Sequence, residues 1–229
     1  MALQSISENI AAARDAISLA ARGADRNPDD ISLIAVSKRK PATDIAAAAS
    51  AGIQDFGENF LQEAIPKIEA LAHLPLRWHF IGAVQSNKTR AIATYFHWIH
   101  TIDRVKIARR LSEQCPENKI LDLCIQVNVD GDPNKAGVAP EDASRLLRVL
   151  ADLPRIRVRG LMTMLDRSSD PGKSYARLAE IFTSLRPAAN QWDTLSMGMS
   201  GDFREAIAAG ATHVRVGTAI FGPRNQGRL

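Results

Sequence analysis

The chain has 229 residues, a formal net charge of +4 and 45% hydrophobic residues, which suits a globular protein with a sizeable core. No apolar run reaches the length of a membrane span, and the start lacks the basic-then-apolar layout of a signal peptide, so we expect a cytoplasmic protein without membrane contacts. Basic residues are scattered and aromatic residues make up only 5%, which argues against a nucleic-acid partner. Cys115 and Cys124 give neither a disulfide framework nor zinc spacing, so no metal site is expected.

Helical and strand patterns alternate along the chain. It begins with an amphipathic helix, in which apolar residues recur at helical spacing from Leu3 to Ile17. Strand patterns then follow at 31–38, 53–57, 76–82, 98–102, 121–129, 158–164, 194–197 and 213–217. Helical patterns lie between them, and those after the first, second, fourth, fifth, sixth and seventh strand patterns end near residues 51, 73, 114, 153, 185 and 209. Pro66 predicts a bend or break in the helix that ends near residue 73.

This alternation predicts a parallel sheet. None of the eight strand patterns looks like an exposed edge, which favours closure into a (β/α)8 barrel of the TIM type, with one extra N-terminal helix. We expect residues 1–229 to form a single α/β domain. The alternative is a doubly wound open sheet.

The first strand pattern ends on a lysine. Alternation places Ile34, Val36 and Lys38 on one face, so Lys38 is expected to be the last side chain at the carboxyl end of a buried strand. Proteins of the α/β class keep their chemistry at that edge, where a half-buried amine can form a Schiff base with a carbonyl group. The alternative is a solvated lysine that has left the strand.

Small and hydroxyl residues follow the seventh and eighth strand patterns, where such barrels commonly bind a phosphate. Gly198, Ser200 and Gly201 follow the seventh, and Gly217 and Thr218 follow the eighth. Glycine lets backbone N–H groups approach an anion closely. The two loops together therefore predict an anion site.

Arg215 lies inside the eighth strand pattern, among valines. A buried guanidinium needs a partner, which is either a structural carboxylate such as Glu58 or Asp103, or a ligand. A strand-end lysine, a phosphate site and a buried arginine together match what pyridoxal 5′-phosphate requires, with the arginine against the ring nitrogen.

Several short motifs occur in order along nearly the whole chain. They are Ala-Val-Ser-Lys (35–38), Gly-Glu-Asn (57–59), Trp-His-Phe-Ile-Gly (78–82), Gln-Val-Asn (126–128), Gly-Leu-Met (160–162), Leu-Ser-Met-Gly-Met-Ser (195–200) and Val-Arg-Val-Gly-Thr (214–218). In these motifs the chain resembles the YggS/PROSC family, the pyridoxal phosphate homeostasis proteins.

The resemblance implies a barrel similar to the N-terminal domain of alanine racemase, with the cofactor pyridoxal 5′-phosphate held as a Schiff base on Lys38. It implies phosphate contacts from the positions of Asn59, Ser200, Gly217 and Thr218, and it places Arg215 beside the ring nitrogen. It further implies a role in intracellular homeostasis of the cofactor, with pyridoxal-phosphate-dependent apoenzymes as partners. We expect a monomer.

We expect binding without enzymatic turnover, and therefore no catalytic residue. A guanidinium stays protonated, so the ring nitrogen facing it should stay unprotonated and the cofactor should be a weak electron sink. The chain stops soon after the eighth strand, so no second domain is expected to bring another base, and Tyr95 and Tyr175 lie on predicted helices.

Two enzymes remain as alternatives. One is a fold-type III amino-acid racemase or related enzyme that uses Lys38 as its single base. The other is a Schiff-base aldolase for a sugar phosphate; such barrels usually carry the lysine on strand six, and the pattern at 158–164 has none. Lys88 and Lys135 could guide an anion inward or accept the aldehyde a second time, although solvated surface positions are the simpler interpretation.

Overall fold

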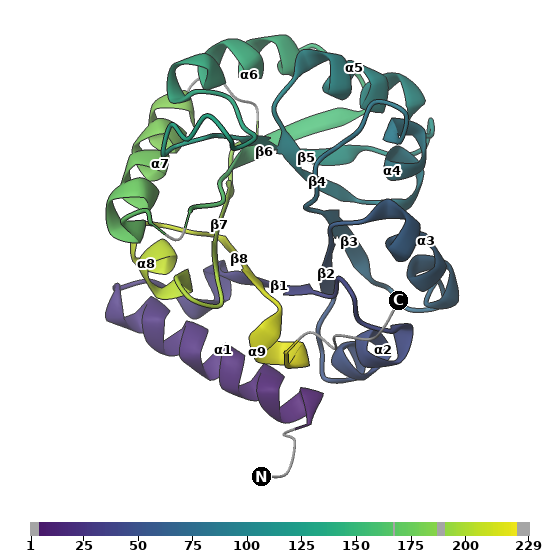
Figure 1. Ribbon diagram of the computed structural model, residues 1–229, viewed down its shortest axis with the longest axis vertical. Helices are drawn as coiled ribbons and strands as arrows, with labels where there is room; N and C mark the ends of the chain where they lie inside the picture. The colour runs from purple at the N-terminus through teal and green to yellow at the C-terminus, as the bar shows by residue number, and fades with distance from the viewer. Residues whose placement is uncertain (1–4, 167, 187–190, 224–229) are drawn as a thin grey trace.

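The structure, a computed structural model, describes residues 5–166, 168–186 and 191–223. Eight parallel strands form a closed barrel in chain order, with helices around the outside (Figure 1). The first strand pairs with both the second and the eighth, so the sheet has no edge. The predicted (β/α)8 barrel is confirmed, and the open-sheet alternative is wrong.

The elements lie close to the predicted positions. The strands are β1 (Ser32–Val36), β2 (Asp55–Glu58), β3 (Arg77–Phe80), β4 (Trp98–Ile102), β5 (Leu121–Gln126), β6 (Ile156–Met162), β7 (Thr194–Met199) and β8 (His213–Val216). The helices are α1 (Ile6–Gly23), α2 (Ala42–Ser50), α3 (Leu61–Ala70), α4 (Thr89–Tyr95), α5 (Val105–Gln114), α6 (Ala143–Ala151), α7 (Pro171–Leu185), α8 (Phe203–Ala208) and α9 (Thr218–Phe221). Two short 3₁₀ helices, η1 (Pro28–Asp30) and η2 (Pro140–Asp142), precede β1 and α6.

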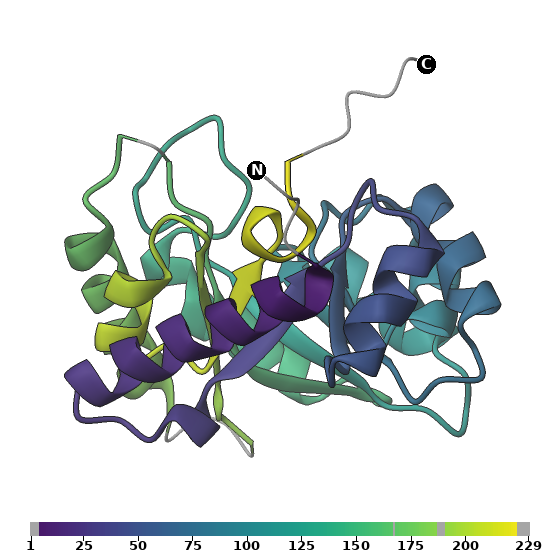
Figure 2. The same cartoon turned by 90° about the horizontal axis from the view of Figure 1, so that it is seen from below.

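The extra N-terminal helix is present as α1 and lies against α2, α8 and α9 along one side of the barrel (Figure 2). Ser5 caps it, because its hydroxyl accepts from the backbone N–H of Glu8 while the Glu8 carboxylate accepts from the N–H of Ser5. Its residues Ile10, Ile17 and Ala21 are buried. No helix among the described residues is both long and apolar enough to cross a bilayer.

Two features of the helices differ from the sequence prediction. Pro66 lies inside α3 without breaking it, because Leu61, Ala64 and Ile68 are buried on the barrel side of the helix while Pro66 is exposed on the other. Tertiary packing therefore offsets the hydrogen bond that proline cannot donate. The short helix α9, which starts directly after β8, was not predicted.

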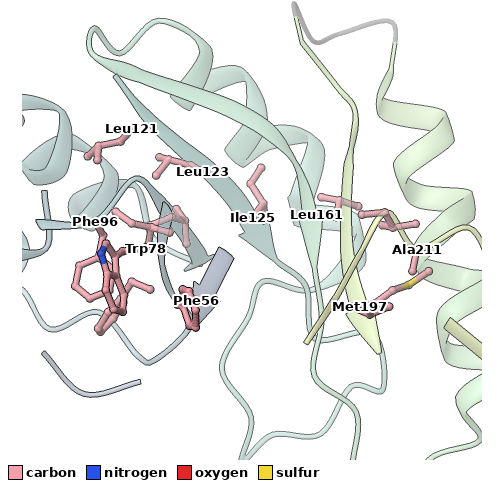
Figure 3. Close-up of a cluster of buried hydrophobic side chains, with 14 of the residues drawn as sticks. Phe56, Trp78, Phe96, Leu121, Leu123, Ile125, Leu161, Met197 and Ala211 are labelled. Atoms are coloured by element: carbon pink, nitrogen blue, oxygen red, sulfur yellow. The ribbon is translucent and has the colours of Figure 1, made fainter. Parts of the chain in front are cut away.

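The main apolar core lies between the strands and the surrounding helices. Strand residues such as Leu123, Ile125 and Leu161 belong to one buried cluster that also contains Leu111 and Leu178 from the helices (Figure 3). The side chains of a strand alternate, so the residues between these point into the barrel.

The interior of the barrel is unusually polar. Its small apolar cluster consists of Trp98, Cys124 and Met162. The buried polar side chains that cross the interior are His79, His100, Ser196 and Arg215. Barrels of this type are usually filled by bulky aliphatic residues, so these four groups need a structural or functional reason.

Candidate functional site

The sequence-predicted site residues lie together at the carboxyl end of the barrel. β1 pairs with β2 on one side and with β8 on the other, and β7 pairs with β8, so four strand ends adjoin there (Figure 1). Lys38, Asn59, Ser200 and Thr218 each follow one of these strands by one or two residues. The structure thus brings all of them to one sector of the barrel mouth, next to Arg215 in β8.

Lys38 lies just beyond its strand and not on it. β1 ends at Val36, and Lys38 is half-buried in the turn that follows. The strand stops because Arg39 adopts a left-handed backbone conformation, with φ of 60°, which turns the chain away from the sheet. The prediction that Lys38 is the last side chain of a strand is wrong, but its position at the mouth is retained.

A buried ion cluster holds this turn. The carboxylate of Glu58 accepts hydrogen bonds from the Ser37 hydroxyl (2.7 Å) and from Nζ of Lys67 (2.9 Å), and Lys67 also donates to the backbone carbonyl of Ser37 (3.0 Å). Glu63 accepts from Lys67 and from the backbone N–H of Arg39. The sequence did not predict Lys67 as a residue of the site. The available signal was the spacing of four residues between Glu63 and Lys67, next to a buried strand.

Arg215 is buried, with 3% of its surface exposed. Its guanidinium donates to the hydroxyl of Ser196 (2.7 Å) and to the backbone carbonyl of Thr163 (2.8 Å), and it forms no ion pair with any described residue. Burial lowers the pKa of Arg215 below its usual value. A buried cation whose partners are all neutral can stabilise a further hydrogen-bond acceptor that binds at the mouth.

The carboxylates expected as structural partners of Arg215 lie elsewhere. Glu58 is bonded to Ser37 and Lys67 on the helix side of the sheet, and Asp103 pairs with Arg104. The interpretation of Arg215 as a structural ion-pair partner of Glu58 or Asp103 is therefore wrong. The sequence could not reveal Ser196 and Thr163 as its partners, because they lie 19 and 52 residues away along the chain.

The loop after β7 turns tightly. Gly198 has a φ of +90°, and a Cβ added to it would lie 2.6 Å from the Cβ of Ala206, so only glycine fits. The carboxylate of Asp202 accepts from the backbone N–H of Met199 (2.6 Å), which closes the turn. Ser200 is left exposed at its tip.

The loop after β8 is equally compact. Gly217 lies at the start of α9, and the exposed Thr218 begins that helix. The first N–H groups of a helix have no acceptor within the helix, so they are available to an anion. The predicted pair of small, donor-rich loops is thus present, and the loops adjoin because β7 pairs with β8.

Asn59 is tightly held by its backbone but keeps an unused acceptor. A Cβ on Gly82 would lie 2.0 Å from the Asn59 carbonyl oxygen, so the chain after β2 packs directly on the turn after β3. The side-chain oxygen Oδ1 of Asn59 is buried and has no hydrogen-bond partner. Buried polar atoms are rarely left unpaired, because an unpaired one costs free energy. A ligand that donates a hydrogen bond to this oxygen would remove that cost.

The two tyrosines of the chain lie on the outer helices α4 and α7. Tyr175 is fully buried in α7, where its hydroxyl is hydrogen-bonded to Asp202, and burial is the main cause of its raised pKa. The Tyr95 hydroxyl donates to Glu69 (2.6 Å) on the outside of the barrel. Their predicted placement on helices is confirmed. Within the described ranges, no three His, Cys, Asp or Glu residues are grouped to hold a metal ion.

The closed barrel, with its loop cluster after β1, β2, β7 and β8, defines a protein of the alanine racemase N-terminal domain class. The sequence model described as "Alanine racemase, N-terminal domain" matches residues 3–225. An alanine racemase from Corynebacterium glutamicum has the same fold, with a TM-score of 0.69 over 98% of this chain and 62% of that chain, at 17% identity.

More similar proteins narrow the class. The chain is 49% identical over 226 residues to the pyridoxal phosphate homeostasis protein of Pseudomonas aeruginosa, covering 98% of each chain, and 45% identical to that of Escherichia coli K12, covering 97% of this chain and 98% of the other. PipY of Synechococcus elongatus, solved without and with pyridoxal phosphate, matches with TM-scores of 0.85 and 0.82 at 39% and 37% identity, over 95% of this chain and 100% of that chain. The chain therefore belongs to the family of pyridoxal phosphate homeostasis proteins.

Proposed function

We propose that this protein binds pyridoxal 5′-phosphate through Lys38 and holds it for pyridoxal-phosphate-dependent apoenzymes, so that it contributes to homeostasis of the cofactor without turnover of its own. The observation that carries the proposal is Arg215, a buried cation with only neutral hydrogen-bond partners, at the barrel end where Lys38 also lies. PipY, a relative at 37% identity, was solved with the same cofactor bound.

The residues at the mouth fit this cofactor. Its phosphate requires several donors, and the exposed loops around Ser200 and Thr218 offer backbone N–H groups and hydroxyls. Asn59 brings a half-buried side-chain amide whose NH2 group can donate to a phosphate oxygen. When bound, the cofactor supplies an aldehyde with which the amine of Lys38 condenses, releasing water.

Arg215 sets the chemistry of this site toward binding. Its guanidinium stays protonated at neutral pH, so it can only donate, and the ring nitrogen opposite it must act as an acceptor. An unprotonated ring draws electrons weakly compared with a ring held by a carboxylate. We therefore expect Arg215 to orient the cofactor while leaving it a poor catalyst.

The placement of the tyrosines supports the same conclusion. A two-base racemase needs a second proton-transfer group opposite Lys38. Tyr175 is buried beneath the loop after β7, and Tyr95 is bonded to Glu69 on the outer surface. Neither hydroxyl can serve as that group, so the racemase that remains is one with Lys38 as its single base.

Turnover assays separate the carrier from this enzyme. The purified protein, saturated with the cofactor, should neither racemise nor transaminate a panel of amino acids above the rate of free pyridoxal phosphate, whereas transfer to an added apoenzyme should restore that enzyme's activity. Lys38→Ala serves as the matched control. Racemisation at ordinary enzyme rates, abolished in Lys38→Ala, would overturn the proposal in favour of the single-base enzyme.

The proposal also includes the oligomeric state and the location of the protein. We infer a single-domain monomer in the cytoplasm, consistent with a barrel that closes on itself within one chain. Light scattering coupled to size exclusion should give the mass of one chain, 24.9 kDa. A stable mass of twice this value would contradict the monomer.

A further inference from the structure

A continuous chain of hydrogen bonds, which we call the file, runs through the barrel interior from Arg215 at the carboxyl end to Asp55 at the amino-terminal end. Arg215 donates to the Ser196 hydroxyl at 2.7 Å, and that hydroxyl lies 2.9 Å from Nδ1 of His100. Nε2 of His100 lies 2.9 Å from Nδ1 of His79, and Nε2 of His79 lies 2.9 Å from the carboxylate of Asp55. The bond between His100 in β4 and Ser196 in β7 joins strands that are not neighbours, so it crosses the barrel.

The chemistry at the two ends gives this file a direction. A guanidinium can only donate, so the oxygen of Ser196 accepts from Arg215, and the proton of Ser196 can turn toward Nδ1 of His100. A carboxylate can only accept, so His79 must donate from Nε2 to Asp55 and leave its Nδ1 as an acceptor. His100 then donates from Nε2. Both histidines are neutral, with the proton on Nε2, and each of the four contacts has one donor and one acceptor.

The surroundings keep the file in this state. Asp55 also accepts two hydrogen bonds from Arg77, both at 2.7 Å, and its pKa lies below its usual value because His79 and Arg77 outweigh the effect of burial. Burial lowers the pKa of His79 and of His100, which favours their neutral forms. An ionised acceptor thus ends the file at the amino-terminal end of the barrel.

The far end of the file is open to solvent. An open cavity of about 700 Å³ lies at the amino-terminal end of the barrel, and its lining includes Asp55, Arg77, His79 and Asp122. Asp122 resembles Asp55 in its setting, because it lies at the same barrel end and is paired with arginine, Arg157. It takes no part in the file, which makes it a matched control.

We propose that His100 and His79 are positioning residues for the cofactor site, and that together with Ser196 and Asp55 they hold the Arg215 guanidinium in one donor orientation from the opposite end of the barrel. This inference rests on the proposed function in one respect only, namely that Arg215 faces the cofactor. The hydrogen-bond file itself is a property of the protein alone and can be tested without the cofactor.

Long-range proton–nitrogen NMR of histidine-labelled protein, without added cofactor, tests the file at pH 7.5. His79 and His100 should both be neutral with the proton on Nε2. In Asp55→Asn the terminal group can donate as well as accept, so a reversed file becomes possible and the two rings should show mixed tautomers. In Asp122→Asn both rings should stay as in the wild type. A charged ring, or a proton on Nδ1 of either ring, in the wild type would overturn the inference.

Cofactor binding gives the second measurement. Asp55→Asn should weaken retention of pyridoxal 5′-phosphate by about five- to tenfold, the factor expected for one hydrogen bond, and Asp122→Asn should leave it unchanged. Equal retention in all three proteins would refute the positioning role even if the tautomers agree. Expected tautomers in a wild type that binds no cofactor would instead refute the proposed function and leave the file intact.

Discussion

Replacing Lys67 by methionine tests how the Lys38 turn is held. Nζ of Lys67 has three oxygen partners, on Ser37, Glu58 and Glu63, at 3.0, 2.9 and 2.6 Å. The side chains of Lys67 and Glu58 are 9% and 0% exposed. In Lys67→Met the Glu58 carboxylate keeps only the Ser37 hydroxyl as a donor, and an uncompensated buried charge of this kind costs about 3–5 kcal/mol.

Urea unfolding at pH 8 measures this loss. Since burial raises the pKa of Glu58, the uncompensated carboxyl can take up a proton, and the deficit of Lys67→Met should be smaller at pH 5 than at pH 8. The double variant Glu58→Met, Lys67→Met should recover much of the stability, because it removes both charges. Lys173→Met, which breaks an exposed pair with Asp170, should be indistinguishable from the wild type. A loss below about 1 kcal/mol in Lys67→Met would refute the reasoning.

Two further predictions concern the site and the barrel interior. Gly82→Ala places a Cβ 2.0 Å from the Asn59 carbonyl, so it should cost about 1–3 kcal/mol and weaken cofactor retention, whereas Gly23→Ala, at the end of α1, has open space around it and should do neither; equal behaviour in unfolding and binding assays would contradict this. Burial lowers the pKa of His79 and His100 below 6.5, so only the unfolded chain takes up these protons as the pH falls. Stability should therefore be fully present above about pH 7 and should fall below pH 6.5 by up to about 1.4 kcal/mol per pH unit for each histidine; urea midpoints that are equal at pH 7.5 and 5.5 would contradict it.

The sequence was informative where function depends on position along a strand. Apolar strand patterns separated by helical patterns placed Lys38, Asn59, Ser200 and Thr218 at or just after the ends of parallel strands, and a closed barrel brings such ends together. Local glycine and hydroxyl patterns likewise indicated the two loops after β7 and β8.

The sequence was uninformative where function depends on contacts across the barrel. The partners of Arg215 are Ser196 and Thr163, and the relative register of β6, β7 and β8 that brings them together is not encoded in any local pattern. For the same reason no local pattern shows that His79 and His100 are hydrogen-bonded to each other.

The visible absorption spectrum of the purified protein tests the central claim most directly, before and after borohydride, with Lys38→Ala alongside. We expect the wild type with added pyridoxal 5′-phosphate to show a yellow absorption band that borohydride abolishes, leaving the cofactor covalently fixed to a peptide that contains Lys38. Lys38→Ala should retain no covalent cofactor. A wild-type protein that stays colourless with added cofactor would contradict the account, as would covalent retention in Lys38→Ala through another lysine.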